Sequence, residues 1–315
     1  IAYFTDLKST VLSSSADITK GSSAPFKAIT CMFLGTAILA LNDAVLKWLT
    51  SDYNAGQIMF CRGIFISLPL SLLIWRSGGF SALKTENPKA HFLRALLVIT
   101  GTFLFISGLK YLPLTDAVAI AFAGPLFITA LAQPLLREKV GWRRWSAVLT
   151  GFLGILLIVR PGGSVMQWAA LLPLAASFTG ALRDILTRHL SGQESSVALL
   201  FYTSIGVTAT GLASLPFTWT SVPIFDWLLF SLSGLLIGSA HFLMIETFRY
   251  GEAALVAPFK YSDIIWAGIL GYLIWGHIPE LPTIVGSGIV IIAGFYLLKR
   301  ERVKNKRIKS GLRLQ

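Results

Sequence analysis

The sequence predicts an all-α integral membrane protein with ten transmembrane helices, arranged as two inverted repeats of five helices. Three observations lead to this fold class: ten long apolar segments, basic residues that fall on one side of them, and a pattern that recurs in both halves of the chain. Of the 315 residues, 54% are hydrophobic and 13% are charged, whereas a soluble domain has about a quarter of its residues charged. The composition therefore argues against a large soluble protein.

Each apolar segment comes close to the roughly 20 residues that a helix needs to cross a bilayer. The segments leave a polar N-terminal tail (1–27), short loops and a basic C-terminal tail (299–315), and they divide into a first repeat (28–159) and a second repeat (166–298). In chain order the expected spans are 28–49, 57–75, 91–110, 115–136, 142–159, 166–186, 197–217, 226–248, 253–275 and 281–298.

The basic residues predict the orientation. With the N-terminus on one side, the tails and loops of that side carry 20 Lys and Arg residues, and the loops of the opposite side carry only Lys110 and Arg160. Because cytoplasmic loops carry the excess of Lys and Arg, both termini are expected in the cytoplasm. The net charge of +12 comes largely from the C-terminal tail, which suits anionic lipid head groups rather than nucleic acid. We expect a multi-pass protein of the bacterial inner membrane.

The two halves of the chain resemble each other. The first span ends with Leu41, Asp43 and Lys47, and the sixth span ends with Leu182, Asp184 and Arg188, at a constant offset of 141 residues. Since each repeat would hold five spans, the second copy enters the membrane from the opposite face. Inverted repeats are typical of alternating-access carriers, which hold their substrate near the midplane between the two repeats. A channel or a lipid enzyme with this topology stays open as an alternative.

Ionisable side chains within the spans are candidate site residues, because they are costly in hydrocarbon. Asp43–Lys47 and Asp184–Arg188 are spaced four residues apart on one helix face. One interpretation is that each pair is neutralised within its helix, with the long cation reaching the membrane interface. The other is that the charges form two gates: an outer cluster that pairs when the carrier faces inward and an inner cluster that pairs when it faces outward. The expected gating residues are Asp43, Lys47 and Arg62 outside and Asp184, Arg188 and Glu246 inside, with Arg94 and Lys260 in the inner cluster.

The fourth and ninth spans are expected to bend at Pro125 and Pro258, since proline frees a backbone carbonyl. Near these bends, lysine suits a carboxylate, aspartate suits a cationic group, and aromatic rings can stack on a ring or a cation. Plain helix geometry and core packing are the alternatives for the prolines and aromatics. The expected substrate-binding residues are Asp43, Arg94, Phe122, Pro125, Lys260, Tyr261, Asp263 and Trp266.

Motifs for other chemistry are missing from the sequence. It has no Walker motif, no HExxH and no GxSxG, and its four histidines are scattered. Cys31 and Cys61 lie in apolar segments and are interpreted as core residues. We therefore expect no enzyme activity, no cofactor and no metal. The expected partners are a small-molecule substrate and membrane lipid. Small residues such as Gly151, Gly154, Gly286 and Gly288 allow close helix contacts, within the chain or in a homodimer.

Several local features are similar to the drug/metabolite transporter superfamily, EamA type. They are Pro125 in the fourth span, the turn 137–139 (Arg-Glu-Lys) and the Gly151/Gly154 pair. One departure is His277, where the second copy usually has Glu. Within the family, the stretches 42–47, 91–94, 142–145 and 257–261 resemble S-adenosylmethionine uptake carriers of intracellular bacteria.

The resemblance implies a secondary-active metabolite transporter that works by alternating access on a small zwitterionic or cationic metabolite such as S-adenosylmethionine. Three alternatives stay open: a proton-coupled exporter of amino acids or drugs, a carrier of a lipid precursor, and a role other than transport.

Overall fold

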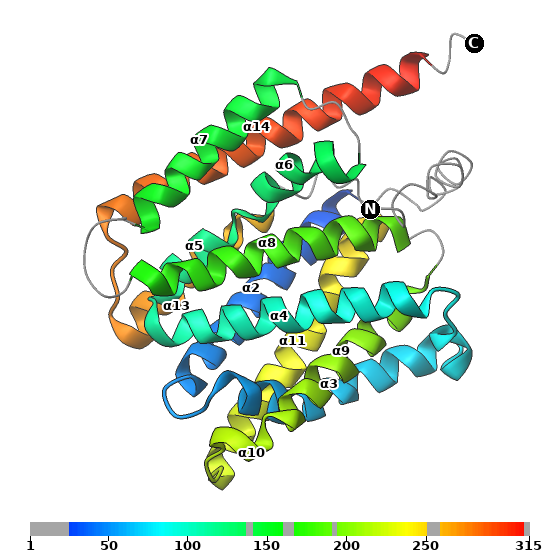
Figure 1. Cartoon of the computed structure of the whole chain (residues 1–315), viewed down its shortest axis with the longest axis vertical. Helices are drawn as coiled ribbons and strands as arrows, with labels where there is room; N and C mark the ends of the chain where they lie inside the picture. The colour runs from blue at the N-terminus through cyan, green and yellow to red at the C-terminus, as the bar shows by residue number, and fades with distance from the viewer. Residues whose placement is uncertain (1–24, 137–140, 160–166, 191–193, 251–258, 312–315) are drawn as a thin grey trace.

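The computed structural model describes residues 25–136, 141–159, 167–190, 194–250 and 259–311, and every regular element in these ranges is a helix (Figure 1). In chain order the α-helices are α2 (Pro25–Leu49), α3 (Ala55–Arg76), α4 (Pro88–Tyr111), α5 (Leu114–Ala121), α6 (Gly124–Leu136), α7 (Trp142–Val159), α8 (Gln167–Leu190), α9 (Ser196–Ala213), α10 (Leu215–Thr218), α11 (Ile224–Tyr250), α13 (Ser262–Trp275) and α14 (Leu281–Gly311), with a 3₁₀-helix, η3 (Gly79–Leu83), before α4.

Eight helical segments of the described chain are long and apolar enough to cross a membrane, and two more, Ser262–Trp275 and Leu281–Leu297, are apolar but shorter. All ten lie where the sequence predicts spans. The fourth predicted span is broken in two, and the first part of the ninth lies outside the described residues. The expected membrane character is therefore confirmed, while the number of ten spans stays a prediction.

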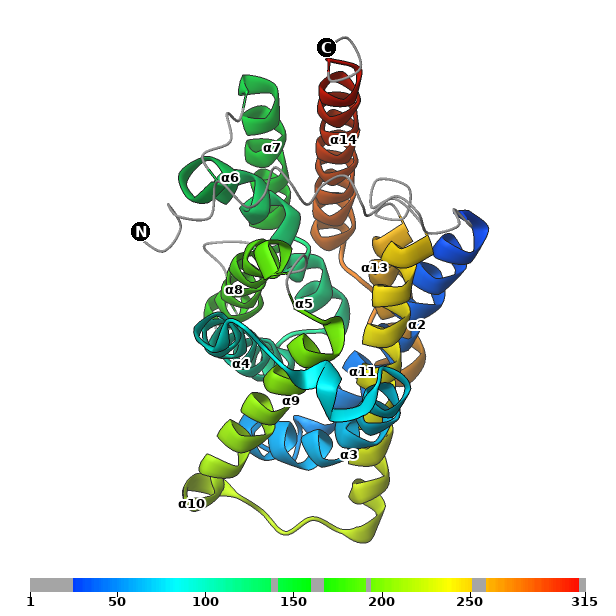
Figure 2. The same ribbon diagram turned by 90° about the vertical axis from the view of Figure 1, so that its right-hand side faces the viewer.

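The helices pack in pairs that join distant parts of the chain. α2 lies against α11, α3 against α9, α4 against α8, and α7 against α14; Figure 2 shows the α7–α14 and α4–α8 pairs side by side. Glycines allow the close approach that such contacts need in a membrane. A methyl group added at Gly234 of α11 would lie 2.7 Å from the carbonyl oxygen of Arg62 on α3, and one added at Gly154 would lie 2.8 Å from that of Gly286.

The bend expected at Gly124-Pro125 is a full break between α5 and α6. The backbone N–H of Phe122 closes α5 on the carbonyl of Val118, and α6 starts again with Phe127 N–H donating to Ala123 O at 3.0 Å. The Phe122 ring stacks on Tyr261, which stands just before α13, with ring centroids 5.0 Å apart. The break in the fourth span therefore faces the start of α13.

One end of the bundle is fastened by a cluster around Glu194, which we call the Glu194 clasp. The Glu194 carboxylate accepts hydrogen bonds from Thr85 Oγ1 at 2.7 Å and from the backbone N–H groups of Glu86 at 3.0 Å and Asn87 at 3.2 Å. His91 Nε2 lies 3.1 Å from its second oxygen, and both side chains are buried. The clasp ties the connection between α3 and α4 to the connection between α8 and α9.

The opposite end of the bundle is fastened as well. The Gln57 side-chain amide donates to Thr220 O at 2.7 Å and accepts from Thr220 N–H at 3.1 Å. Tyr53 Oη donates to Asp226 Oδ2 at 2.5 Å. These bonds join the α2–α3 connection and the first turn of α3 to the segment between α10 and α11 and the first turn of α11. The early and late parts of the chain are thus hydrogen-bonded to each other at both ends.

The α7–α14 contact predicts a sharp difference between two glycines of α14. In Gly286→Ala the new methyl group would lie 2.5 Å from Gly154 O, whereas at Gly288 no atom lies within 4 Å of it. We expect Gly286→Ala to destabilise the protein by about 1–3 kcal/mol, measured by thermal unfolding in detergent. Gly288→Ala is the matched control, and equal unfolding temperatures for the two variants would contradict the close contact.

The Glu194 clasp predicts a pH-dependent stability. Burial alone raises the pKa of the Glu194 carboxyl, but hydrogen bonds from Thr85, His91, Asn87 and Glu86 outweigh it and hold the pKa below its ordinary value. A lowered pKa in the folded state stabilises the fold above the unfolded-state pKa of about 4.3, and this stabilisation is lost as the pH falls through the folded-state pKa.

We therefore expect Glu194→Gln to lower the free energy of unfolding by about 1–3 kcal/mol at neutral pH. The difference from the wild type should shrink in acid, as followed by unfolding in detergent over a pH series. Glu86→Gln, whose side chain is exposed, serves as the control. A constant difference across the pH series would rule out the carboxylate as the cause.

Candidate functional site

The candidate site includes a row of polar residues on one face of α2. Thr36 and Asp43 are two turns apart on the same side of this apolar helix, and both are buried. Asn42 Nδ2 donates to Asp43 Oδ1 at 3.0 Å, and Asn42 Oδ1 accepts from Ser233 Oγ of α11 at 2.8 Å. The α2–α11 contact therefore fixes the amide of Asn42, which in turn orients the Asp43 carboxylate.

Arg62 of α3 lies near Asp43, close enough for the two charges to attract each other. Its side chain is buried, and its Nε has no hydrogen-bond partner. The structure thus brings together two of the three residues expected in the outer cluster. Within the described residues, the carboxylate and the guanidinium are attracted to each other but not in direct ion-pair contact, since the ion pairs within 4.0 Å are His91–Glu194 and Arg183–Asp184.

The contacts of Lys47 differ from the Asp43–Lys47 pairing expected on α2. Its Nζ does not pair with Asp43 but donates to the carbonyls of Leu109 at 2.9 Å and Leu112 at 2.7 Å. These carbonyls stand at the C-terminal end of α4, where backbone acceptors lack helical partners and a cation is favourable. Lys47 therefore caps α4, and the i,i+4 spacing on α2 reflects a shared face rather than an ion pair.

Asp263 approaches Asp43 from α13. Ser262 Oγ and Thr36 Oγ1 share a hydrogen bond of 2.8 Å, which places the start of α13 against α2. Asp263 is 7% exposed, and its Oδ1 has no hydrogen-bond partner. The charges that act on it are the Asp43 carboxylate, which repels it, and Lys260, which attracts it. Lys260 thus acts on Asp263, and its place in the inner cluster stays a prediction.

The expected aromatic residues have different surroundings. Trp266 meets Phe33 of α2 edge to face at 5.2 Å, and its buried Nε1 has no partner. Tyr261 is stacked between Phe122 and Phe295 of α14. Trp266 therefore presents an unused donor beside α2, whereas Phe122 and Tyr261 form a packed column next to the break at Pro125.

A second charged group lies where α4, α8 and α9 meet. Arg94 Nε donates to Thr187 Oγ1 at 2.8 Å, and its Nη1 donates to Leu199 O at 2.8 Å and Thr203 Oγ1 at 2.7 Å. Asp184, expected in the same cluster, pairs with the adjacent Arg183 at 2.7 Å. The side chains of the remaining two expected gating residues, Arg188 and Glu246, lie outside the described residues.

His241 of α11 is a site residue that the sequence reasoning missed. Its side chain is exposed, yet the charges that act on it belong to Arg183, Arg62 and Arg94, from three other helices. A lone histidine in the middle of an apolar span was the available signal.

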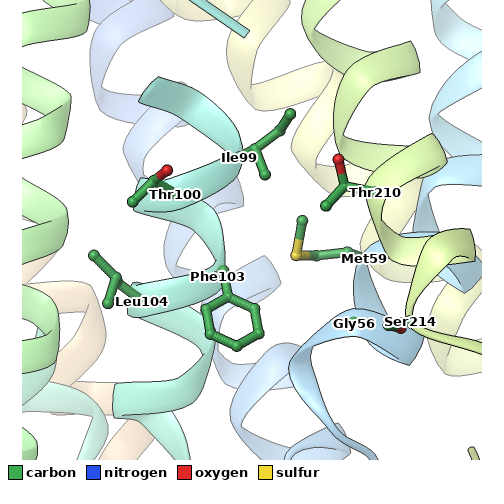
Figure 3. A pocket seen from close by; sticks show the side chains of 8 residues that line it. All are labelled: Gly56, Met59, Ile99, Thr100, Phe103, Leu104, Thr210 and Ser214. Carbon is green, nitrogen blue, oxygen red and sulfur yellow. The ribbon is translucent and has the colours of Figure 1, made fainter. Parts of the chain in front are cut away.

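A separate cavity of about 280 Å³ lies between α3, α4 and α9 (Figure 3). Ile99, Phe103 and Met59 point into it from two helices. Its lining is mostly apolar and includes none of the expected site residues. In the part of the chain that the structure describes, no group of three or more His, Cys, Asp or Glu residues could hold a metal ion.

Several proteins that are similar to this chain are named as transporters. The chain is 29% identical to an S-adenosylmethionine uptake transporter of Rickettsia prowazekii, covering 86% of this chain and 92% of that protein. It is 27% identical to a riboflavin transporter of Rhizobium johnstonii (88% and 92%), and 23% identical to a pseudopaline exporter of Pseudomonas aeruginosa (85% and 95%).

A solved crystal structure shares the fold, with a TM-score of 0.60 at 18% identity over 88% of this chain and 98% of the other. The profile of the EamA-like transporter family matches the chain twice, over residues 26–160 and 167–299. The two matches together span most of the sequence. This protein therefore belongs to the EamA-like transporter family and is a membrane transporter rather than an enzyme.

Proposed function

We propose that this transporter carries a small zwitterionic or cationic metabolite, with S-adenosylmethionine as the leading candidate. The observation that carries the proposal is the pair of buried carboxylates, Asp43 on α2 and Asp263 on α13, which act on each other and have no cation in direct contact among the described residues. A buried carboxylate with no cation in direct contact is costly, so an amine or sulfonium placed between the two would stabilise both.

The proposed mechanism is alternating access between two inverted repeats. If each helix of the first half is exchanged with its counterpart in the second half (α2 with α8, α3 with α9, α4 with α11, α7 with α14), the α2–α11 contact becomes the α8–α4 contact. The α3–α9 and α7–α14 contacts are unchanged by this exchange. The second match of the family profile begins at residue 167, close to the start of α8. Both features support an internal two-fold axis of the kind found in carriers with midplane sites.

The charged clusters are proposed as the two gates. Asp43 and Arg62 lie toward the end of the bundle that is fastened by Gln57 and Thr220, and Arg94 and Asp184 lie toward the end fastened by the Glu194 clasp. The polar contacts at one end would open while those at the other stay closed.

We further propose that both termini face the cytoplasm of a bacterial inner membrane, because 20 of the Lys and Arg residues lie on one side of the spans. A reporter that fluoresces only in the cytoplasm, fused after Gln315, should be bright. The same reporter inserted at Pro279, in the connection between α13 and α14, should be dark. The reverse pattern would invert the topology.

The transport proposal predicts the effect of two substitutions. Labelled S-adenosylmethionine should enter liposomes that contain the purified protein, and internal unlabelled compound should increase the rate if the carrier exchanges substrate. Asp43→Asn and Asp263→Asn should each reduce uptake at least about tenfold, since a lost ionic contact with a buried group costs about 1.5–3 kcal/mol.

Asp52→Asn is the control, because Asp52 is exposed in the loop after α2. If both site variants still take up the compound at the wild-type rate, the two carboxylates are not part of the substrate site. If correctly folded protein takes up no S-adenosylmethionine, the proton-coupled exporter becomes the better candidate. The unpartnered Oδ1 of Asp263 favours that second function, which predicts a flux that follows an imposed pH gradient.

A further inference from the structure

One ammonium group joins three helices at the end of the bundle where α2 ends. Lys47 stands in the last turn of α2, and its Nζ donates to Leu109 O at 2.9 Å and to Leu112 O at 2.7 Å. Leu109 belongs to the last turn of α4, and Leu112 belongs to the short connection between α4 and α5. Lys47 therefore holds the corner at which the chain leaves α4 and enters α5.

The third helix at this point is α13. The ring of Trp275, the last residue of α13, has its centroid 5.9 Å from Lys47 Nζ. The same ring meets the ring of Trp48, the next residue along α2, at 6.3 Å. An ammonium group at this distance is attracted to the indole face. Since lysine has three N–H donors, it can bind two carbonyls and still interact with the ring.

The contacts of Lys47 cross between two groups of helices. α2 packs mainly against α11 and α13, whereas α4 packs mainly against α8 and α9. Figure 2 shows these two groups on different sides of the view. The hydrogen bonds of Gln57 with Thr220 and of Tyr53 with Asp226 lie at the same end but leave α4 out. A movement of α4 away from α2 at this end would therefore break the Lys47 bonds and keep the others.

Water can replace the ammonium group when these helices part. The Lys47 side chain is half-buried, and the last carbonyls of a helix have no backbone partner within that helix. The Asn42–Ser233 hydrogen bond, which lies deeper on α2, is buried by contrast. Opening at Lys47 thus leaves no polar group without a partner in the apolar interior, which would be costly.

We propose that Lys47, bound to the carbonyls of Leu109 and Leu112 and to Trp275, is a latch that closes the outer end of the transporter. The outer end is the one that faces away from the cytoplasm in the proposed topology. This inference deepens the proposed alternating-access function and rests on it. Asp43 lies one turn deeper on the same face of α2, so cargo that enters from outside passes the latch before it reaches this carboxylate. Lys47 is a positioning residue of the transport cycle and does not itself bind the cargo.

The experiment measures distances between α2 and α4 at both ends of these helices, by pulsed electron paramagnetic resonance on the full chain in lipid nanodiscs. Spin labels at Asp52→Cys and Lys110→Cys report on the outer end. In a second protein, labels at Phe26→Cys and Lys89→Cys report on the inner end. All four of these side chains are exposed.

Both labelled proteins carry Cys31→Ser and Cys61→Ala, so that no native thiol is labelled. Lys47→Met keeps the apolar stem and removes the donors. It should raise the ratio of long to short outer distances at least about tenfold, because hydrogen bonds from a charged group are lost. The inner distances should stay as narrowly distributed as before. Arg76→Met removes an exposed cation at the end of α3 and is the control, with both distances unchanged.

The distances do not depend on which compound is carried. The latch can therefore fail while the proposed substrate stands, and the reverse also holds. An outer distance in Lys47→Met that equals that of the control would overturn the latch. Broadening of the outer and inner distances alike would overturn it too, because Lys47 would then hold the whole fold together instead of closing one end.

Discussion

The structure depends on one constraint: inside an apolar phase, polar groups must find their partners within the protein. The helices meet most of this requirement through their own backbone hydrogen bonds. Polar side chains and the backbone groups at helix breaks need other partners. Their hydrogen bonding differs between the ends and the middle of the bundle. At both ends of the bundle, side chains make several hydrogen bonds across the chain. Glu194 accepts from three donors and lies beside His91, and Gln57 both donates to and accepts from Thr220.

In the middle of the bundle, the same kinds of groups are left incomplete. Asp263 Oδ1, Arg62 Nε and Trp266 Nε1 are buried without partners, and Arg94 has only uncharged acceptors. A transporter must bind its substrate without trapping it, so a fully satisfied interior would leave nothing for the substrate to complete. We therefore propose that the cargo binds at the incomplete groups in the middle of the bundle and not at its hydrogen-bonded ends.

The positions of the spans were predictable from sequence, because length and hydropathy alone decide whether a helix can cross a bilayer. The bend at Pro125 was also predictable, since proline removes a backbone donor wherever it stands. The partners of charged residues were not. Lys47 lies four residues after Asp43 yet binds the end of α4, and the charge of Lys260 acts on Asp263. Such pairings depend on which helices become neighbours, and the spacing along one helix carries no information about that. His241 was missed for the same reason, because the charges that act on it belong to three arginines on other helices.

The two halves of the chain differ at one pair of corresponding positions, Asn42 and Arg183. Asp43 and Asp184 occupy matching places in the two halves, but their neighbours differ. Asp43 follows Asn42, a neutral amide that donates to the carboxylate and orients it. Asp184 follows Arg183, which pairs with it directly and cancels that charge. This one difference leaves Asp43 without a cation in direct contact among the described residues, whereas Asp184 has one. If the two halves are the inverted repeats that we propose, this difference makes Asp43, rather than Asp184, the carboxylate that is left for a cationic group of the cargo.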